Sequence, residues 1–228
     1  MNRHTSLNLI KENSKETKEI YVFSNLNEIK AIFNDLSNDI EKNLEFASKD
    51  SFVSENMLNE FLRYQIIKIE SGFDYIVHLI IKLGFINIFR EQWHTTDRYN
   101  NFPVCFFQLK DAIIKGIDEN WVLNMVDNKI SPQTYLDYNC LKDGLNYCKQ
   151  GLISDIAVNI YGKVAHESLE LLKRDIGIVY KRRNLIAHQN DIDHKTGEKN
   201  NISIEDVNSC KIIIFNFISA ALSELEKL

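Results

Sequence analysis

Apolar residues recur every three or four positions along the first third of the chain, which is the spacing of an amphipathic α-helix. In residues 25–45 this stripe comprises Leu26, Ile29, Phe33, Leu36, Ile40 and Leu44. Residues 54–85 keep the same spacing from Leu58 to Ile80, and Gly84 is the expected end of that helix. The pattern therefore predicts two long helices before residue 86.

The middle of the chain has shorter apolar runs separated by turn-forming residues. Residues 87–104 mix aromatic residues with turn formers and predict an irregular connection, after which residues 105–117 return to helical spacing. Residues 121–153 predict two or three short helices, with breaks near Pro132 and Gly144.

The last third has the clearest pattern. Residues 163–189 predict one or two helices, with Gly177 as a weak point, and residues 190–201 predict a polar loop. Ser203 and Asp206 then match a capping box, in which a serine and an acid three residues later satisfy backbone N–H groups at a helix start. The apolar face that follows comprises Val207, Cys210, Ile214, Phe217, Ile218, Ala221 and Leu225. The whole pattern predicts an all-α fold.

Composition agrees with long helices in a globular domain. Of 228 residues, 44% are hydrophobic and 26% are charged, which is ordinary for a globular protein. The 2 prolines and 8 glycines are too few to form the turns between many short strands. The first residues lack the apolar core of a signal peptide, and the most apolar stretches look too short or too interrupted to span a bilayer. The four cysteines follow no regular framework and are expected to be buried free thiols. We therefore expect a cytoplasmic protein with no membrane partner.

Charge is distributed unevenly along the chain. The net charge of -5 argues against a protein that coats nucleic acid non-specifically. Between Lys173 and Lys199, however, seven cations face four acids, so this window is locally positive. An acidic chain with one basic window is compatible with a local binding site for an anionic ligand.

Several common kinds of active site have no counterpart in the sequence. There is no HExxH, no paired CxxC, no phosphate-binding glycine loop, no GxGxxG and no GxSxG. His188 and His194 are six residues apart across a polar loop, which is not a recognised metal-ligand spacing. No metal and no cofactor is therefore expected.

One short segment, RNLIAH, carries candidate chemistry. On a helix, Asn184 and His188 share a face with Lys181, whereas Arg183 starts about 140° from His188 around the axis. An imidazole can take a proton from a ribose 2′-OH, and a guanidinium can stabilise the charge that builds on a phosphate. The alternative is a solvated helix end, where cations oppose the negative end of the helix dipole.

RNLIAH, bracketed by Arg183 and His188, resembles the R-x4-6-H motif of the HEPN superfamily in its RNxxxH form. Its surroundings, LELLKRDIGIVYKRRNLIAH followed by a loop and ISIEDV, resemble the RiboL-PSP branch. The resemblance implies a HEPN-like helical bundle over residues 51–228, with residues 1–50 as a polar N-terminus and a helical extension. It also implies a homodimer that brings two Arg/His motifs into one composite cleft.

The family resemblance implies a metal-independent endoribonuclease acting as a toxin or antiviral-defence effector, with an RNA substrate and an antitoxin or other defence protein as a further partner. Arg183 would stabilise the phosphate and the transition state, and His188 would act as general base or acid. Asn184 would orient the histidine or bind phosphate, although a helix-surface amide remains open as its role. The early helix of the family often carries an acid facing the site, for which Glu70 is the best match and Asp74 the second.

Glu70 would position an arginine, with a surface carboxylate as its alternative. Arg182 and Lys181 would contact RNA; the alternative is that both are solvated surface cations. The alternative to the enzyme as a whole is a non-catalytic HEPN module that binds RNA or serves in dimerisation and assembly.

Overall fold

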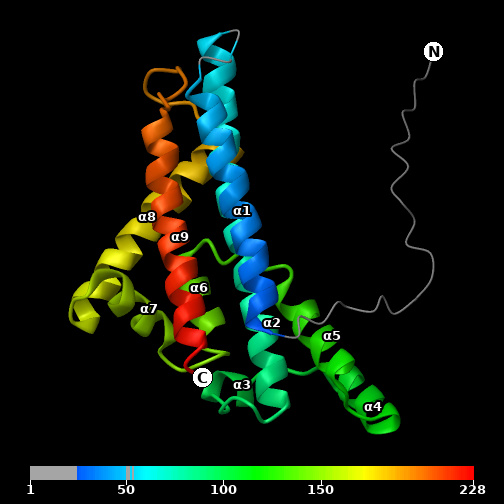
Figure 1. Cartoon of the computed structure of the whole chain (residues 1–228). Helices are drawn as coiled ribbons and strands as arrows, with labels where there is room; N and C mark the ends of the chain where they lie inside the picture. The colour runs from blue at the N-terminus through cyan, green and yellow to red at the C-terminus, as the bar shows by residue number, and fades with distance from the viewer. Residues whose placement is uncertain (1–24, 50–51, 53) are drawn as a thin grey trace, which may run out of the picture.

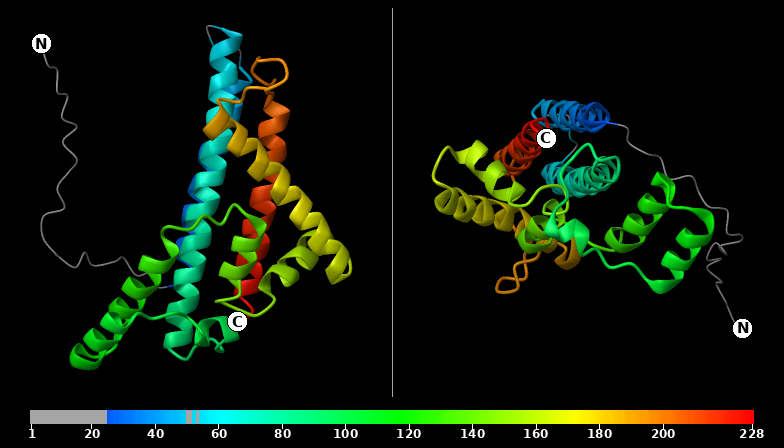
Figure 2. Two further views of the ribbon diagram at one scale, coloured as in Figure 1. Left: turned by 180° about the vertical axis from the view of Figure 1, so that it is seen from behind. Right: turned by 90° about the horizontal axis from the view of Figure 1, so that it is seen from below.

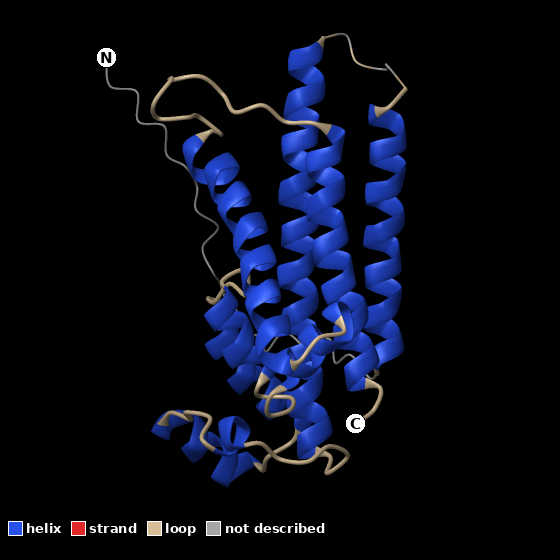
Figure 3. Ribbon diagram, turned by 90° about the vertical axis from the view of Figure 1, so that its left-hand side faces the viewer, coloured by secondary structure: helices blue, strands red, loops and turns tan. Residues whose placement is uncertain are grey.

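The structure is a computed structural model that describes residues 25–49, 52 and 54–228. Within these residues the fold is helical and holds no strand (Figure 3). A single antiparallel bridge joins Ile192 and Lys199 within the same residues. The helices are α1 (Leu26–Ala47), α2 (Glu55–Phe89), α3 (Asp97–Asn100), α4 (Phe106–Lys115), α5 (Glu119–Ile130), α6 (Tyr138–Leu145), α7 (Leu152–Tyr161), α8 (Ala165–Gln189) and α9 (Ile204–Leu225). The predicted all-α class is confirmed. The expected polar N-terminus, before α1, lies outside the described residues.

Three long helices, α1, α2 and α9, lie side by side and form the body of the molecule (Figures 1 and 2). Helix α8 packs on α2, α7 and α9, and α6 and α7 fill the space at its side. Helix α5 packs on α2, and with α4 it forms an arm that stands away from α8 and α9 (Figure 2). The core therefore runs along α2, which contacts helices on several sides.

Helix α2 continues to Phe89, so the expected end at Gly84 is wrong. A side chain at Gly84 would collide with Cys148, and one at Gly72 would collide with Leu36. These two glycines therefore allow neighbouring segments to approach the helix closely, and neither interrupts it.

Because α2 is unbroken, it is long and apolar enough to cross a membrane by length and composition, contrary to the expectation that its apolar stretch is too interrupted. It is the one helix with this property among the described residues. Of its most apolar window, 67% is buried inside the fold. Packing against α1, α5, α8 and α9 accounts for its apolar character, as in the core helix of a globular domain.

The shorter helices follow the sequence expectations closely. The connection after α2 contains the four-residue α3, and three helices, α5, α6 and α7, follow α4. The predicted break near Pro132 lies between α5 and α6, whereas Gly144 lies inside α6, where its Cα packs against Tyr135 and Ile81. The capping box at Ser203 and Asp206 is confirmed, and α8 is one continuous helix through Gly177.

Helix α1, expected as an extension, shares the hydrophobic core with the remaining helices. Ile29, Ile40 and Leu44 are buried against α2 and α9. The boundary expected at residue 50 thus falls between two helices that pack on each other. The four thiols are all free, but only Cys148 and Cys210 are buried; Cys105 and Cys140 are exposed, which corrects that expectation.

Candidate functional site

The C-terminal turns of α8 lie against α2, and the chain reverses direction there. Asn190 and Asp191 have φ of 53° and 58°, in the left-handed region that Asn and Asp adopt more readily than other non-glycine residues. The backbone N–H of Asp191 donates to the Leu185 carbonyl at 2.8 Å and closes the helix end. This reversal places the candidate motif at a solvent-facing corner of the bundle.

Arg183 and His188 meet within one chain. Nη1 of Arg183 lies 3.2 Å from Nε2 of His188 and donates to Oδ1 of Asn184 at 3.1 Å. The long arginine stem therefore spans the offset of about 140° between the two positions. A guanidinium only donates, so in this contact Nε2 of His188 accepts and the proton of the neutral imidazole is assigned to Nδ1. Asn184 contacts the arginine, which favours a role in orienting Arg183 over one in orienting the histidine.

Glu70 lies beneath Arg183, on the face of α2 that meets α8. Its side chain is buried, and its Oε2 is 3.8 Å from Nε of Arg183. Neither carboxylate oxygen has a hydrogen-bond partner among the described residues. Burial raises the pKa of Glu70 to about 8, opposed by the charge of Arg183 and assisted by that of Asp74. The alternative of a surface carboxylate is therefore wrong.

The raised pKa of Glu70 predicts that the protein loses stability as the pH rises from about 4.5 to about 8. In this window the folded chain keeps a proton that the unfolded chain has lost, so the free energy of unfolding falls by up to about 1.4 kcal/mol per pH unit. Glu70→Gln removes this titration. We expect the variant to gain stability relative to wild type between pH 5 and pH 8, measured by urea unfolding at each pH. A difference between the two proteins that is independent of pH would contradict the assignment; Glu60→Gln, at a more exposed site, is the control.

Asp191 joins α2, α8 and the polar loop through one buried carboxylate. Its side chain has no exposed surface, and its Oδ2 accepts from Nε of Arg63 at 2.7 Å. Its Oδ1 accepts from Nη1 of Arg182 and from Nδ2 of Asn200 at 3.1 Å. Nη2 of Arg63 donates in turn to the Asn200 carbonyl at 2.6 Å. We call Arg63, Arg182, Asp191 and Asn200 the loop clamp.

Sequence reasoning missed the loop clamp as a unit. Within Phe61–Ile66 of α2, Arg63 has polar as well as apolar neighbours. Nothing in the local sequence therefore marks it as unusual. One feature of the sequence does point to this contact. Arg63 and Glu70 are seven residues apart, so these two charged residues lie on one face of α2, about 10 Å apart along the axis. Arg63 meets Asp191 and Glu70 meets Arg183, so these two polar contacts set the register of α8 on α2.

The two remaining cations of the motif have different surroundings. Arg182 belongs to the loop clamp and also donates to the Asn201 carbonyl at 3.0 Å, so its guanidinium is engaged by the protein. Lys181 is exposed and, with Arg174 and Ile178, lines a shallow groove of about 350 Å³ on α8. Lys181 lies two turns before His188 on the same face, which leaves it accessible to a ligand bound at the histidine.

Asp74, the second candidate acid, is engaged elsewhere. It accepts from the backbone N–H of Tyr135 at 2.6 Å and lies 3.7 Å from Nε2 of His78. That histidine in turn contacts the Gln133 carbonyl at 3.2 Å. Asp74 and His78 therefore hold the segment before α6, and Glu70 is the acid that faces Arg183.

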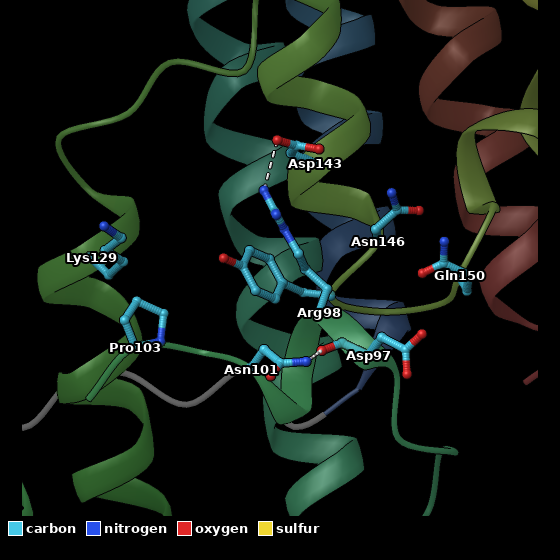
Figure 4. Close-up of a pocket in the computed structure, with 9 residues that line it drawn as sticks. Asp97, Arg98, Asn101, Pro103, Lys129, Asp143, Asn146 and Gln150 are labelled. Carbon is cyan, nitrogen blue, oxygen red and sulfur yellow. Dashed lines mark hydrogen bonds and ion pairs between the residues drawn. The ribbon is translucent and has the colours of Figure 1, made fainter.

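Another hollow, of about 550 Å³, lies beside α3 and α6 at the opposite end of α2 (Figure 4). Arg98 extends across it, pairs with Asp143 at 2.7 Å and places its Cζ 5.6 Å from the centre of the Tyr147 ring. Asn101 donates to the Asp97 carbonyl at 2.8 Å. These polar groups largely satisfy one another, and no histidine is among the residues that line the hollow, so it holds no counterpart of the Arg183–His188 pair.

In the part of the chain that the structure describes, no group of three or more His, Cys, Asp or Glu side chains is arranged to hold a metal ion. The chemistry available at the corner of the bundle is that of a neutral imidazole, a guanidinium and a buried carboxyl group. Comparison of the chain with protein-family models, with curated proteins and with solved structures finds no match to any of the three.

Proposed function

We propose that the chain is a metal-independent endoribonuclease of the HEPN type, with a HEPN-like bundle as its fold. The observation that carries this proposal is the contact of 3.2 Å between Nη1 of Arg183 and Nε2 of His188 at an exposed helix end. The spacing of these residues matches the RNxxxH motif, and the helices that carry and flank them, α8 and α9, are joined by the polar loop that this motif usually precedes.

In the proposed reaction a phosphate of RNA binds to the guanidinium of Arg183. Phosphate oxygens compete with Nε2 of His188 for the same N–H donors, and a charged acceptor makes the stronger hydrogen bond. Binding of the substrate therefore frees the lone pair of His188. Asn184 and Glu70 keep contacts with Arg183 at Nη1 and near Nε, so the guanidinium keeps its direction during this exchange.

The freed imidazole then takes the proton of the ribose 2′-OH. The 2′-oxygen forms a bond to phosphorus, the bond between phosphorus and the 5′-oxygen breaks, and the leaving 5′-oxygen takes up a proton. The imidazolium formed in the first half is a suitable donor for that proton. Arg183 stabilises the negative charge on the phosphate in between. The products are a 2′,3′-cyclic phosphate and a 5′-hydroxyl end.

The biological setting belongs to the same proposal. We propose a cytoplasmic toxin or antiviral-defence effector that acts as a homodimer and is restrained by an antitoxin or another defence protein. Lys181 is an exposed cation on the same face of α8 as His188 and is available to contact RNA phosphates. Arg182 acts mainly by holding the loop clamp together.

The test is incubation of the purified protein with total RNA in excess chelator, followed by mapping of new ends. We expect cleavage to persist in chelator and to leave 2′,3′-cyclic phosphate and 5′-hydroxyl termini. Cleavage that requires a divalent metal, or that leaves 5′-phosphate ends, would disprove the mechanism. RNA that is bound but left intact would favour the non-catalytic HEPN module instead.

A further inference from the structure

Helix α4 presents large apolar side chains to solvent. The exposed fraction is 81% for Phe106, 73% for Phe107, 77% for Ile113 and 70% for Ile114. Val104, Leu109 and Ile117 on and beside the helix are also exposed. We call these seven residues the α4 face. Solitary exposed apolar side chains are ordinary, but seven on one short segment indicate a surface that binds something.

The α4 face points away from the rest of the molecule. At about 100° per residue, the apolar residues of α4 occupy one arc of about 160° around the helix. In order around this arc they are Leu109, Ile113, Phe106, Ile114 and Phe107, and Lys110 is the one other residue within it. On the opposite side Ala112 is buried, and Nε1 of Trp121 donates to the Gln108 carbonyl at 3.2 Å. The polarity is thus the reverse of that of a surface helix in a monomer, whose apolar stripe faces the core.

An apolar hollow of about 330 Å³ adjoins the same helix. Phe89, Phe102, Val104, Ile117 and Trp121 are among its lining residues. Its floor is an aromatic cluster, in which the rings of Phe85 and Phe102 lie 4.8 Å apart. The apolar ridge of the α4 face and this hollow thus lie next to each other, where the arm meets α3 and the end of α2. Figures 1 and 2 show the course of these helices.

We infer that the α4 face is a homodimer interface, occupied by the same face of a second copy of the chain. A two-fold axis beside the arm would let the ridge of each copy enter the hollow of the other, which satisfies both surfaces in a closed assembly. At about 200 Å² for each fully exposed phenylalanine and somewhat less for each aliphatic side chain, the α4 face exposes roughly 800 Å². A stable interface buries about 800 Å² on each partner, so the α4 face is large enough by itself.

Two other classes of occupant fit the surface less well. RNA binds through cations and base stacking, and Lys110 is the one cation within the apolar arc. An anionic membrane would be repelled by a chain of net charge -5 and needs no hollow beside the helix. The inference is independent of the proposed ribonuclease activity, because the arm lies at the end of α2 opposite the loop clamp. It also differs from a dimer centred on α8, which the family resemblance implies.

The test measures molar mass by sedimentation and light scattering from about 1 to 100 µM protein without RNA, for wild type and for Phe107→Glu and Ile113→Glu. We expect a wild-type dimer, and an increase of at least about tenfold in the dimer dissociation constant for each variant, because a charge placed in the interface core stays unpaired. Both side chains are exposed, so folding should be retained, and circular dichroism checks this.

Matched controls are Ile178→Glu on α8 and Ile212→Glu on α9, two exposed isoleucines outside the α4 face. Both controls should stay dimeric. Dissociation of Ile178→Glu together with unchanged dimerisation of the α4 variants would overturn the inference in favour of an α8-centred dimer. A wild-type chain that is monomeric over the whole range would overturn it as well, leaving the face to another occupant.

Discussion

His188→Ala is expected to lower the single-turnover rate of RNA cleavage by about 10²- to 10⁴-fold, the range that a positioned general base or acid contributes. The side chain is exposed and contacts Arg183, so its removal creates no cavity and leaves the fold intact. His194→Ala is the matched control, because His194 is also exposed and, from the adjoining loop, contacts Oε1 of Gln189 at the end of α8. The control should cleave at the wild-type rate.

Arg183→Ala is expected to cost about 2.7–4 kcal/mol of transition-state stabilisation, by analogy with the loss of one oxyanion donor. Arg183→Lys should recover only part of this, because an ammonium cannot make a bidentate contact with phosphate. The loss of the guanidinium should not unfold the protein at pH 7: the pKa of Glu70 is about 8, so its carboxyl group is mostly neutral there and does not require a cation. Arg98→Ala, at the far end of α2, is the arginine control.

These variants are compared on one mapped RNA, with circular dichroism to confirm folding. Wild-type activity in folded His188→Ala would rule out the assigned role of the histidine. Loss of activity in His194→Ala or Arg98→Ala to the same extent would show that the assay reports general damage, and would remove the support for the Arg183–His188 pair.

The helices were predictable where apolar spacing is regular. The stripe from Leu26 to Leu44 became α1, and the box at Ser203 and Asp206 began α9, because both signals are local. The end of α2 was not predictable in this way. Gly84 is a local stop signal, but its Cα packs on Cys148 from a distant segment, and that tertiary contact overrides the local preference.

The site was predictable to the extent that one helix carries it. The spacing of Arg183, Asn184 and His188 placed them together, and the resemblance singled out Glu70 on another helix. Burial of Glu70 was not foreseen, because the sequence does not say which face of α2 meets α8. Periodicity likewise identified α4 as a helix, whereas the outward direction of its apolar stripe depends on how the arm attaches.

The loop clamp illustrates the limit most clearly. Arg63 and Asp191 are separated by 128 positions in the chain, and no local pattern links them. In the sequence Asp191 is one of several polar residues between His188 and His194, and no local pattern distinguishes it from them. In the folded chain, the left-handed turn at Asn190 and Asp191 brings this carboxylate back beneath α8, where it pairs with Arg182.

Asp191→Ala is expected to destabilise the protein by about 3–5 kcal/mol, because it leaves the buried guanidinium of Arg63 without its main counter-charge. Glu60 contacts Nη1 of Arg63 at 3.1 Å and compensates only in part, since it is far more exposed. For a chain of this length the loss corresponds to a fall in Tm of roughly 6–20 °C. Thermal and urea unfolding at pH 7 measure both quantities.

Asp191→Asn removes the negative charge and keeps a residue that tolerates the left-handed backbone conformation, so it tests the two contributions separately. Asparagine tolerates φ of 58° as well as aspartate does and still accepts hydrogen bonds, so the variant should lose less stability than Asp191→Ala. Asp193→Ala is the matched control in the same loop, and should cost under about 1 kcal/mol because its carboxylate caps only the exposed turn at Lys195. A double-mutant cycle of Asp191→Asn with Arg63→Met then isolates the pair. A coupling energy near zero would show that the buried ion pair does not hold the loop, and that α8 is kept in register by apolar packing alone.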